Sequence, residues 1–405
     1  MNLFNEFICN VYEKLYFYFF YIFKIITLYI SYYNNKYDIL YYIFIIFIIG
    51  LISIIIFIKI KLGFWYNIPI KNKYTKDFFI KEKNIIIDKK IPIIDKWYNF
   101  IDIKTMSFST LDKNIFDNHL LELSPNKSYI SIEYVINKEF NNKDNVFQNI
   151  NKLKNILFTI PINITNKNKM YKSYIISNEI NNLTINLDNI NFKLFKTHIY
   201  NVSNKNSVHF IFLFKTYKKL DILQDFITFS LYKLKINNAI EDKNIKTFYN
   251  FLIINKQNIN LVVSLLNDSK KYINFLFLYN LHDILNLIEK NQILIYCLYF
   301  DNSVKSLYIF KKENSEYSLI SSYNLYYENI FYYGFLKSIE NIQKILKNIN
   351  IDITIYDTYY NHIIIDNLIK NKLIINNNFS LYNKIHYYIY NYNYDSSNNN
   401  IITFF

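Results

Sequence analysis

The longest apolar run in the chain covers Ile39 to Ile58, ILYYIFIIFIIGLISIIIFI, with Asp38 and Lys59 at its borders. It contains no charged side chain, and about 20 apolar residues in a helix cross a hydrocarbon core of about 30 Å. The run starts far from the N-terminus and has no small-residue cleavage site, which argues against a signal peptide. We therefore expect a transmembrane helix over 39–58, with a buried core helix as the alternative.

A second apolar run extends from Leu15 to Tyr33 and is interrupted by Lys24. It fits either a second span that pairs with the first as a hairpin or an aromatic-rich helix at the membrane interface. The pattern favours the interfacial or partly inserted helix. Lysines concentrate after the longer run, and by the positive-inside rule the bulk of the chain is then cytoplasmic: Lys59, Lys61, Lys71, Lys73 and Lys76.

Beyond residue 246, apolar residues recur with alternating helical and strand periods. Phe335, Ile339 and Ile342, for example, lie three and four residues apart, as on one face of a helix. The pattern predicts helices at 259–267, 281–289, 335–347 and 363–370, and strands at 292–300, 306–311, 319–325, 351–356 and 386–392.

The first half of the chain has shorter periodic segments, separated by turns rich in Asn, Asp and Lys. We predict helices at 132–139 and 151–159, followed by strands at 174–176, 183–187, 192–200 and 208–214. The predicted order is first helices, then an antiparallel meander, and then a strand, a loop and a helix. This order is typical of the α+β fold class.

The stretch from Ser207 to Leu234 is predicted to contain a strand, a basic turn and a helix. Its apolar part, Val208 to Phe214, is too short for a span, and Lys215, Lys218 and Lys219 follow. A helix is then predicted over 222–234. Such an arrangement can hold an anion, because the first turn of a helix offers unpaired N–H groups and the positive end of the helix dipole. The alternative is an ordinary β–α unit with solvated lysines.

Composition changes this picture in two ways. Hydrophobic residues make up 52% of the 405 residues, which supports a large core. Tyr, Phe, Ile, Asn and Lys replace Ala, Gly, Pro and Arg almost throughout, and there is no Arg at all. This bias is what pressure toward A/T-rich codons produces, and it suggests an AT-rich viral or parasite genome. Single residues therefore carry less information than the order of elements.

The formal net charge is +14, so the chain favours anionic partners such as a membrane surface or a phosphorylated ligand. Specific nucleic-acid recognition is not expected, since no arginine can read a guanine edge. Cys9 and Cys297 give neither a disulfide framework nor a metal-ligand set. His362 and Asp366 alone are too few for a metal site, and we expect no metal.

Four patches along the chain resemble, in order, motifs of the N-myristoyltransferases. Residues 64–70, FWYNIPI, resemble the family's Phe-Trp-x-x-Gln-Pro-Val motif, and 142–147, NKDNVF, its acidic loop. Residues 208–227 resemble its Asn-Phe-Leu-Cys strand, its basic loop and the helix after it. Residues 387–392, YYIYNY, resemble its Tyr-Tyr-Leu-Tyr-Asn-Trp segment. The resemblance covers 64–405.

The resemblance implies two tandem acyl-CoA N-acyltransferase (GNAT-like) domains behind the N-terminal transmembrane helix. The chain then divides into a membrane anchor at 1–62, an acyl-CoA-binding-type domain at 63–245 and a peptide-binding-type domain at 246–405. It also implies transfer of myristate from coenzyme A to an N-terminal glycine, with myristoyl-CoA as substrate and no covalently bound cofactor. N-terminal glycine peptides or myristoylated proteins are the implied partners.

The resemblance assigns site residues in two groups. An oxyanion hole would come from the backbone N–H groups of Phe210 and Ile211, and the base would be the terminal carboxylate of Phe405. The cofactor would be bound by Phe64, Trp65, Lys215, Lys218 and Lys219.

Some of the family's charged positions differ in this chain. The family's Arg-Lys-Arg loop corresponds to Lys218, Lys219, Leu220 and Asp221, in which the acid opposes an anion. Three functions therefore stay open: a membrane-anchored acyl-CoA or myristoyl-peptide binder with weakened or lost catalysis, an active N-myristoyltransferase, and a non-catalytic interaction protein with this fold. The first is preferred.

Overall fold

The chain forms two compact units, 1–67 and 68–405, which are described separately. A computed structural model describes residues 21, 24, 36–63, 70–71, 94, 97–107, 129–141, 146–166, 169–177, 192–206, 210–221, 223–237, 249–269, 273–301, 303–313, 316–325, 328–370, 379–392 and 401–403.

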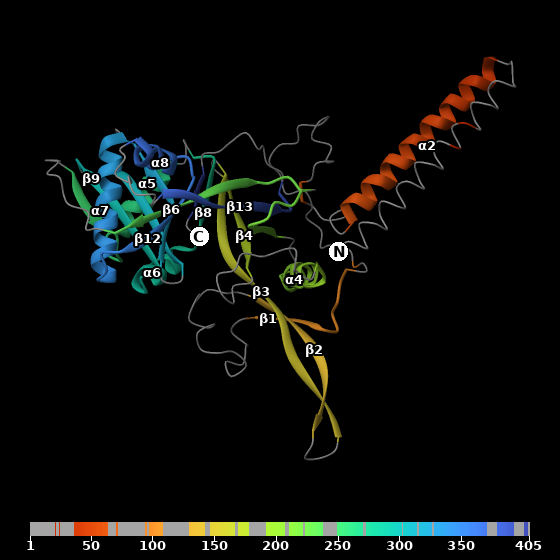
Figure 1. Cartoon of the computed structure of the whole chain (residues 1–405), viewed down its shortest axis with the longest axis horizontal. Helices are drawn as coiled ribbons and strands as arrows, with labels where there is room; N and C mark the ends of the chain where they lie inside the picture. Colours follow the sequence, from red (N-terminus) through yellow and green to blue (C-terminus); the bar gives the residue numbers. More distant parts are fainter. Residues whose placement is uncertain are drawn as a thin grey trace. The chain divides into compact units, whose positions relative to one another are not determined.

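The first unit contains the long helix α2 (Lys36–Leu62), red in Figure 1. Its stretch Tyr42–Ile60 contains one charged residue, Lys59 near the end. In the described residues α2 is the one helix that is long and apolar enough to cross a membrane. Apolar side chains all round it are exposed, among them Phe47 at 62% and Ile54 at 55%. The helix predicted over 39–58 is confirmed. Of the run 15–33, all but Tyr21 and Lys24 lie outside the described residues.

The second unit is built on one continuous sheet. Twelve strands lie in the order β1-β2-β3-β4-β5-β13-β6-β12-β11-β10-β9-β7, while β8 pairs with β3 and β14. The strands are β1 (Ile103–Ser107), β2 (Tyr129–Asn141), β3 (Val146–Asn166), β4 (Lys169–Ser177), β5 (Ile211–Thr216), β6 (Ile227–Ile236), β7 (Asn250–Ile253), β8 (Phe275–Leu278), β9 (Ile293–Phe300), β10 (Ser303–Glu313), β11 (Glu316–Asn324), β12 (Ile351–Tyr356), β13 (Phe379–Tyr390) and β14 (Ile401–Thr403).

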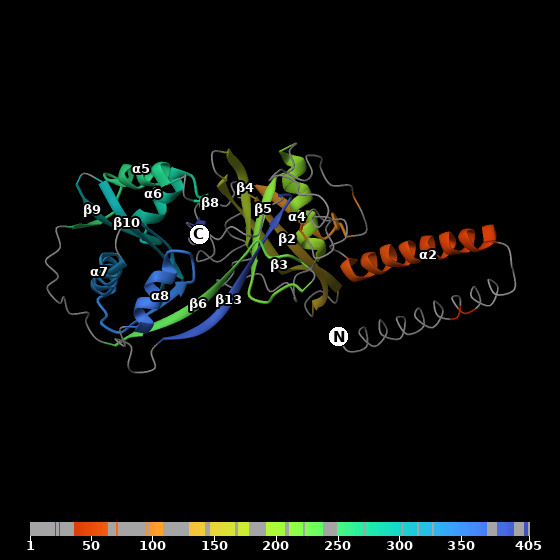
Figure 2. The same ribbon diagram turned by 90° about the horizontal axis from the view of Figure 1, so that it is seen from above.

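Helices cover both faces of this sheet (Figure 2). On β9 and β10, helices α5 (Ile259–Ser269) and α6 (Leu281–Glu289) cover one face, and α7 (Glu328–Leu346) covers the other, beside α8 (Asn361–Lys370). Alternate residues of one strand therefore enter two cores: Ile295 packs in the core under α5 and α6, and Tyr296 in the core under α7 and α8. Helix α4 (Phe192–Lys205) packs on β1, β2 and β3.

The strand order shows an internal repeat. In the first half, β4, α4 and β5 form a parallel crossover, and in the second half β11, α7 and β12 do the same. Antiparallel meanders precede both crossovers, β1 to β4 and β9 to β11. The two halves share this outline without sharing sequence, in agreement with the tandem arrangement that the sequence predicts.

The halves exchange their closing strands. β6, from the first half, lies against β12 of the second, and β13, from the second half, lies between β5 and β6. The predicted boundary at 245/246 falls outside the described residues and stays a prediction. The exchange explains why residues 68–405 form one compact unit.

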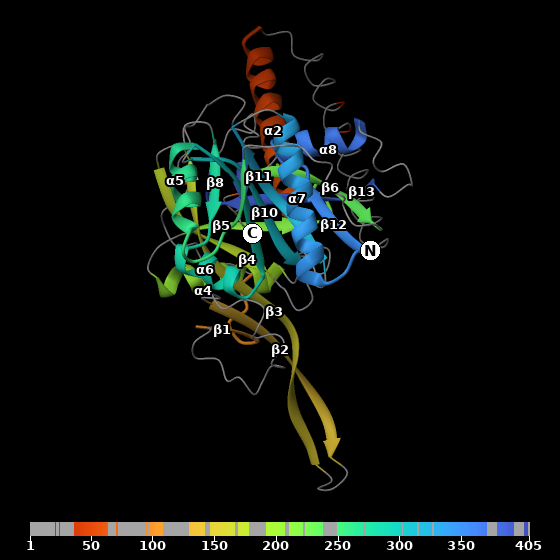
Figure 3. The same cartoon turned by 90° about the vertical axis from the view of Figure 1, so that its left-hand side faces the viewer.

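Outside the body of the sheet, β2 and β3 continue as a two-stranded ribbon (Figure 3). There, 134–141 pair with 146–153, and no third strand in the described part of the chain joins them. Residues 142–145 of the predicted acidic loop lie outside the described residues.

Four predicted elements of the first half are wrong. The helices expected at 132–139 and 151–159 are strands, within β2 and β3, and the strand expected at 192–200 is helix α4. The helix expected at 222–234 is mostly strand β6. Strands 174–176 and 208–214 are confirmed in β4 and β5 as far as the latter is described, and 183–187 lies outside the described residues. Every predicted helix and strand beyond 246 is confirmed.

Pairing explains the errors. In β3 every residue from 156 to 160 is buried, because the strand lies between two antiparallel neighbours, and half-buried and buried residues alternate with a strand period from 161 to 164. In α4 the buried apolar residues Leu194, Phe195, Ile199 and Val202 recur three to four residues apart, a helical period within a sequence rich in aromatic and β-branched residues.

Gly334 allows α7 to approach the sheet closely. A Cβ atom there would lie 2.7 Å from Leu298 Cδ1 and would also meet the Tyr308 hydroxyl. That hydroxyl donates a 2.6 Å hydrogen bond to the Phe331 carbonyl of the same helix. A side chain at 334 would therefore displace a buried hydrogen-bonded tyrosine.

We predict that Gly334→Ala lowers the free energy of unfolding by about 1–3 kcal/mol, since overpacking outweighs the helix propensity gained. Urea denaturation measures this. In a background of Tyr308→Phe with Leu298→Ala, which removes the clashing atoms, the same substitution should cost less; an equal cost in both backgrounds would contradict the packing explanation.

His198 in α4 is fully buried, and burial lowers its pKa to about 3. Its Nδ1 atom lies 2.6 Å from Ser131 Oγ on β2. Since its folded pKa is below the unfolded value of about 6.5, the unfolded state binds the proton first as the pH falls. The stability contributed by neutral His198 is complete above pH 6.5 and is lost between 6.5 and 3.

We predict that the free energy of unfolding falls by about 1 kcal/mol per pH unit below 6.5 from this residue alone. Denaturant midpoints measured between about pH 7 and 5 should show this slope, and His198→Gln should flatten it. An unchanged slope in His198→Gln would assign the acid sensitivity to other groups.

Candidate functional site

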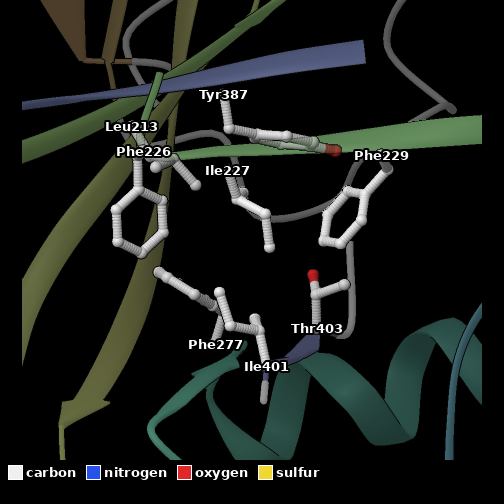
Figure 4. Close-up of a pocket in the computed structure, with 8 residues that line it drawn as sticks. All are labelled: Leu213, Phe226, Ile227, Phe229, Phe277, Tyr387, Ile401 and Thr403. Carbon is white, nitrogen blue, oxygen red and sulfur yellow. The ribbon is translucent and has the colours of Figure 1, made fainter. Parts of the chain in front are cut away.

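A cavity lies where the exchanged strands meet the C-terminal strand. Its lining, drawn in Figure 4, comes from β5, the start of β6, β8, β13 and β14: Leu213, Phe226, Ile227, Phe229, Phe277, Tyr387, Ile401 and Thr403. Both halves of the chain contribute, and ligand sites commonly occupy such junctions.

The chemistry of this lining is apolar. Phe226 meets Phe275 and Phe277 edge to face, with ring centroids 5.1 and 5.7 Å apart. Tyr387 and Thr403 contribute the polar atoms among the lining side chains. The open space is about that of one water molecule, so a longer ligand requires the aromatic side chains to move. A hydrocarbon chain suits this lining, whereas a buried charge would have no partner in it.

One wall of the cavity is held by a polar cluster on its outer side, which we name the Asp225 clamp. It consists of Asp225, Thr228, His386 and Lys219. Asp225 Oδ2 lies 3.0 Å from His386 Nδ1, accepts a 3.0 Å hydrogen bond from Thr228 Oγ1, and lies 3.5 Å from Lys219 Nζ. In sequence Asp225 adjoins Phe226 and His386 adjoins Tyr387, so the clamp fixes two lining residues.

Backbone bonds complete this wall. The Phe226 N–H donates to the Tyr387 carbonyl at 2.8 Å. The Tyr388 hydroxyl accepts a 2.8 Å hydrogen bond from the Leu220 N–H, and burial raises the pKa of this phenol, which keeps it protonated. The segment between β5 and β6 is therefore attached to β13 at several points.

The structure separates the predicted lysines. Lys215 is half-buried on β5, while Lys218 and Lys219 are exposed in the segment after it. Lys219 pairs with Asp225, so part of its charge is neutralised within the chain. Because β6 follows in place of the predicted helix, these lysines do not lie at a helix N-terminus.

Of the predicted oxyanion-hole residues, Ile211 begins β5 opposite Ser173 of β4, and Phe210 precedes it. The Phe210 carbonyl accepts a 3.4 Å hydrogen bond from Asn391 Nδ2. The pairing of β5 with β13 begins at Phe212, so Phe210 and Ile211 lie outside this pairing. Their catalytic role stays a prediction. Phe64, Trp65 and Phe405 lie outside the described residues.

A strand–loop–helix arrangement like the one predicted at 208–234 is present earlier in the chain, from β4 to α4. β4 leads through 178–191, outside the described residues, into α4, and then β5 returns parallel to β4. The sequence signal for it was the helical spacing of Leu194, Phe195, His198, Ile199 and Val202, which are all buried.

Comparison with known proteins identifies this architecture. No protein-family model and no curated protein matches the sequence. Among solved structures, N-myristoyltransferase of Saccharomyces cerevisiae with bound myristoyl-CoA matches at a TM-score of 0.51 and 12% identity, over 82% of this chain and 93% of the yeast chain. The same enzyme with bound myristoyl-CoA and inhibitors matches at 0.54 and 13%, over 84% and 95%.

The chain has the N-myristoyltransferase fold. The match covers most of both proteins, so it includes both halves of the sheet and not a single crossover unit. The resemblance that four weak sequence motifs indicated is thus confirmed at the level of the fold.

We predict that Asp225→Ala lowers the free energy of unfolding by about 1–3 kcal/mol, because it leaves His386 and Thr228 without their shared acceptor. Thermal or urea denaturation measures the loss. Asp221→Ala, on an exposed residue of the same segment, is the matched control and should be near neutral. Equal effects of the two substitutions would show that the clamp does not hold the wall.

Proposed function

We propose that residues 68–405 bind a long-chain acyl group, as myristoyl-CoA or as the acyl chain of a myristoylated protein, with catalysis weakened or lost. The observation that carries this proposal is the apolar cavity at the strand exchange within an N-myristoyltransferase fold. The yeast structures of that fold hold myristoyl-CoA.

The charges of the chain support weakened catalysis. Coenzyme A carries phosphates, and arginine binds phosphate through two parallel hydrogen bonds, which lysine cannot form. This chain has no arginine. One of the two lysines at the predicted loop, Lys219, already has an acidic neighbour at 3.5 Å. Phosphate binding there is therefore expected to be weaker and more sensitive to salt.

The second candidate is an active glycine N-acyltransferase. In such a reaction the amine nitrogen attacks the thioester carbonyl carbon, the C–S bond of the tetrahedral intermediate breaks, and the coenzyme A thiolate leaves. The ammonium first gives one proton to the Phe405 carboxylate, and after the attack the nitrogen gives a second proton to the departing thiolate. The Phe210 and Ile211 N–H groups stabilise the oxyanion. These roles use backbone and terminal groups, so side-chain divergence does not by itself remove them. The third candidate, an interaction protein, would use the fold without binding an acyl group.

We further propose that α2 anchors the protein in a membrane with 68–405 in the cytoplasm. The length and composition of Tyr42–Ile60 support a span, and Lys59, Lys61 and Lys71 after it support this orientation. Its partners would then be membrane-associated proteins with an N-terminal glycine or a myristoyl group.

We predict micromolar or tighter binding of myristoyl-CoA to residues 63–405 by calorimetry, weakening as salt increases. Ile227→Trp, which fills the cavity, should weaken it by about tenfold or more, equal to about 1.4 kcal/mol. Leu381→Trp, on an exposed residue of β13, is the matched control. Lys218→Glu, which leaves the Asp225 clamp unchanged, should weaken binding more than Lys290→Glu on another exposed lysine.

The possible results separate the three candidates. Binding without turnover of glycine-initiated peptides supports the first, and turnover supports the second. A folded sample that binds neither myristoyl-CoA nor a myristoylated peptide would leave only the interaction protein.

A further inference from the structure

The turn Trp97–Ile101, before β1, presents apolar side chains to solvent. Ile101 is 87% exposed and Phe100 43% exposed. Such residues occur singly on many protein surfaces, but here they adjoin Trp97 and Tyr98, which are half-buried. Four of the five residues of this turn, all but Asn99, are thus aromatic or aliphatic.

Asn99 makes this turn rigid. Its Oδ1 accepts hydrogen bonds from the Ile101 and Asp102 N–H groups, both at 3.2 Å, and its Nδ2 donates to Asp102 Oδ2 at 2.9 Å. Its backbone N–H donates to Thr197 Oγ1 on α4 at 3.0 Å. The backbone at Ile101 is therefore held in place although its side chain has almost no contacts.

Aromatic rings form a platform beneath the exposed side chains. Tyr98 stacks on Phe100 at 5.7 Å, and both rings meet Tyr200 of α4 edge to face, at 5.2 and 5.4 Å. Lys196 Nζ lies 5.0 Å from the centre of the Tyr98 ring. Helix α4 is itself anchored by Leu194 and Phe195, which are buried. The fold thus holds Ile101 outward and prevents it from packing inward.

The charges around the turn are mainly basic. Lys104 on β1 and Lys193 and Lys205 on α4 are exposed, and Lys205 Nζ reaches the Thr105 carbonyl at 2.8 Å. Asp102 adds one half-buried carboxylate, whose Oδ2 accepts the hydrogen bond from Asn99 Nδ2. Aromatic and aliphatic side chains with lysines beside them suit the boundary between anionic headgroups and acyl chains, where lysines near the surface strengthen binding to anionic lipid.

We propose that the turn Trp97–Ile101 inserts into the surface of an anionic lipid bilayer. A bilayer is the occupant that the chain itself suggests, because helix α2 is long and apolar enough to span one. The contact is a second, reversible attachment, and it adds to the acyl-group binding proposed above without depending on it.

Depth-dependent quenching on the full chain tests the proposal. The variants Ile101→Cys, Ile52→Cys and Ile349→Cys are each made in a Cys9→Ser background. The introduced cysteine carries a polarity-sensitive fluorophore. Cys297 is buried and stays unlabelled. Ile349 is 56% exposed on another part of the body and is the matched control. The vesicles contain phosphatidylcholine with phosphatidylserine as the minor lipid.

The expected result is that a shallow lipid-borne quencher reduces emission at 101 several-fold more than at 349, while aqueous iodide quenches 349 more. Removal of phosphatidylserine or Lys104→Glu should lessen the difference. Equal quenching at 101 and 349 would overturn the proposal. So would protection of 101 from iodide without lipid quenching, which would indicate a protein partner.

The label at Ile52 separates this proposal from that of the anchor. Quenching at 52 without quenching at 101 overturns the inserted turn and leaves the span. Quenching at 101 without quenching at 52 supports the turn and overturns the span.

Discussion

The structure of residues 68–405 depends on the position of β13 between β5 and β6. Each of its neighbours comes from the first half of the chain, and His386 is opposite Thr216 on one side and Thr228 on the other. Without β13 the two halves of the sheet would have no shared ladder at this point, and both strands would expose an edge. The same strand places Tyr387 in the cavity and His386 in the Asp225 clamp. Strand β13 thus contributes both to the fold and to the candidate site.

Lysine as the sole strong cation shapes the chemistry of the site. A guanidinium can bind a phosphate and still hold a carboxylate through its other donors, whereas an ammonium acts as one point charge. Lys219 Nζ is 3.5 Å from Asp225 Oδ2, so its charge is partly balanced within the Asp225 clamp and is less available to a phosphate. The fold keeps the apolar cavity, which needs only the Ile, Leu, Phe and Tyr that the chain has in excess. Acyl-chain binding therefore tolerates this composition better than phosphate binding does.

The sequence allowed the second half to be predicted because its periods are long and regular: α6 and β12 match their predicted bounds residue for residue. The first half misled because its burial comes from strand pairing, between neighbours in sequence for β2 and β3 and at long range for β6. Phe229 and Leu231 alternate as in a strand, but the bulge at Leu381/Asn383 of the partner strand interrupts the alternation before Leu234. With Ile, Tyr and Phe in helices and strands alike, residue preference could not decide between them. The cavity could not be predicted, since its walls join only after strand exchange.

Strand exchange also constrains how the protein reaches its native state during synthesis. β5 and β6 are made early but acquire their shared neighbour β13 only when residues 379–390 have left the ribosome, and β8 meets β14 later still. Contacts of such high sequence separation slow folding and leave apolar edges open to aggregation in the interval. Helix α2 precedes all of them in the chain. Helix α2 is therefore complete long before the sheet can close, and the edges of β5 and β6 stay open until the last strands are synthesised.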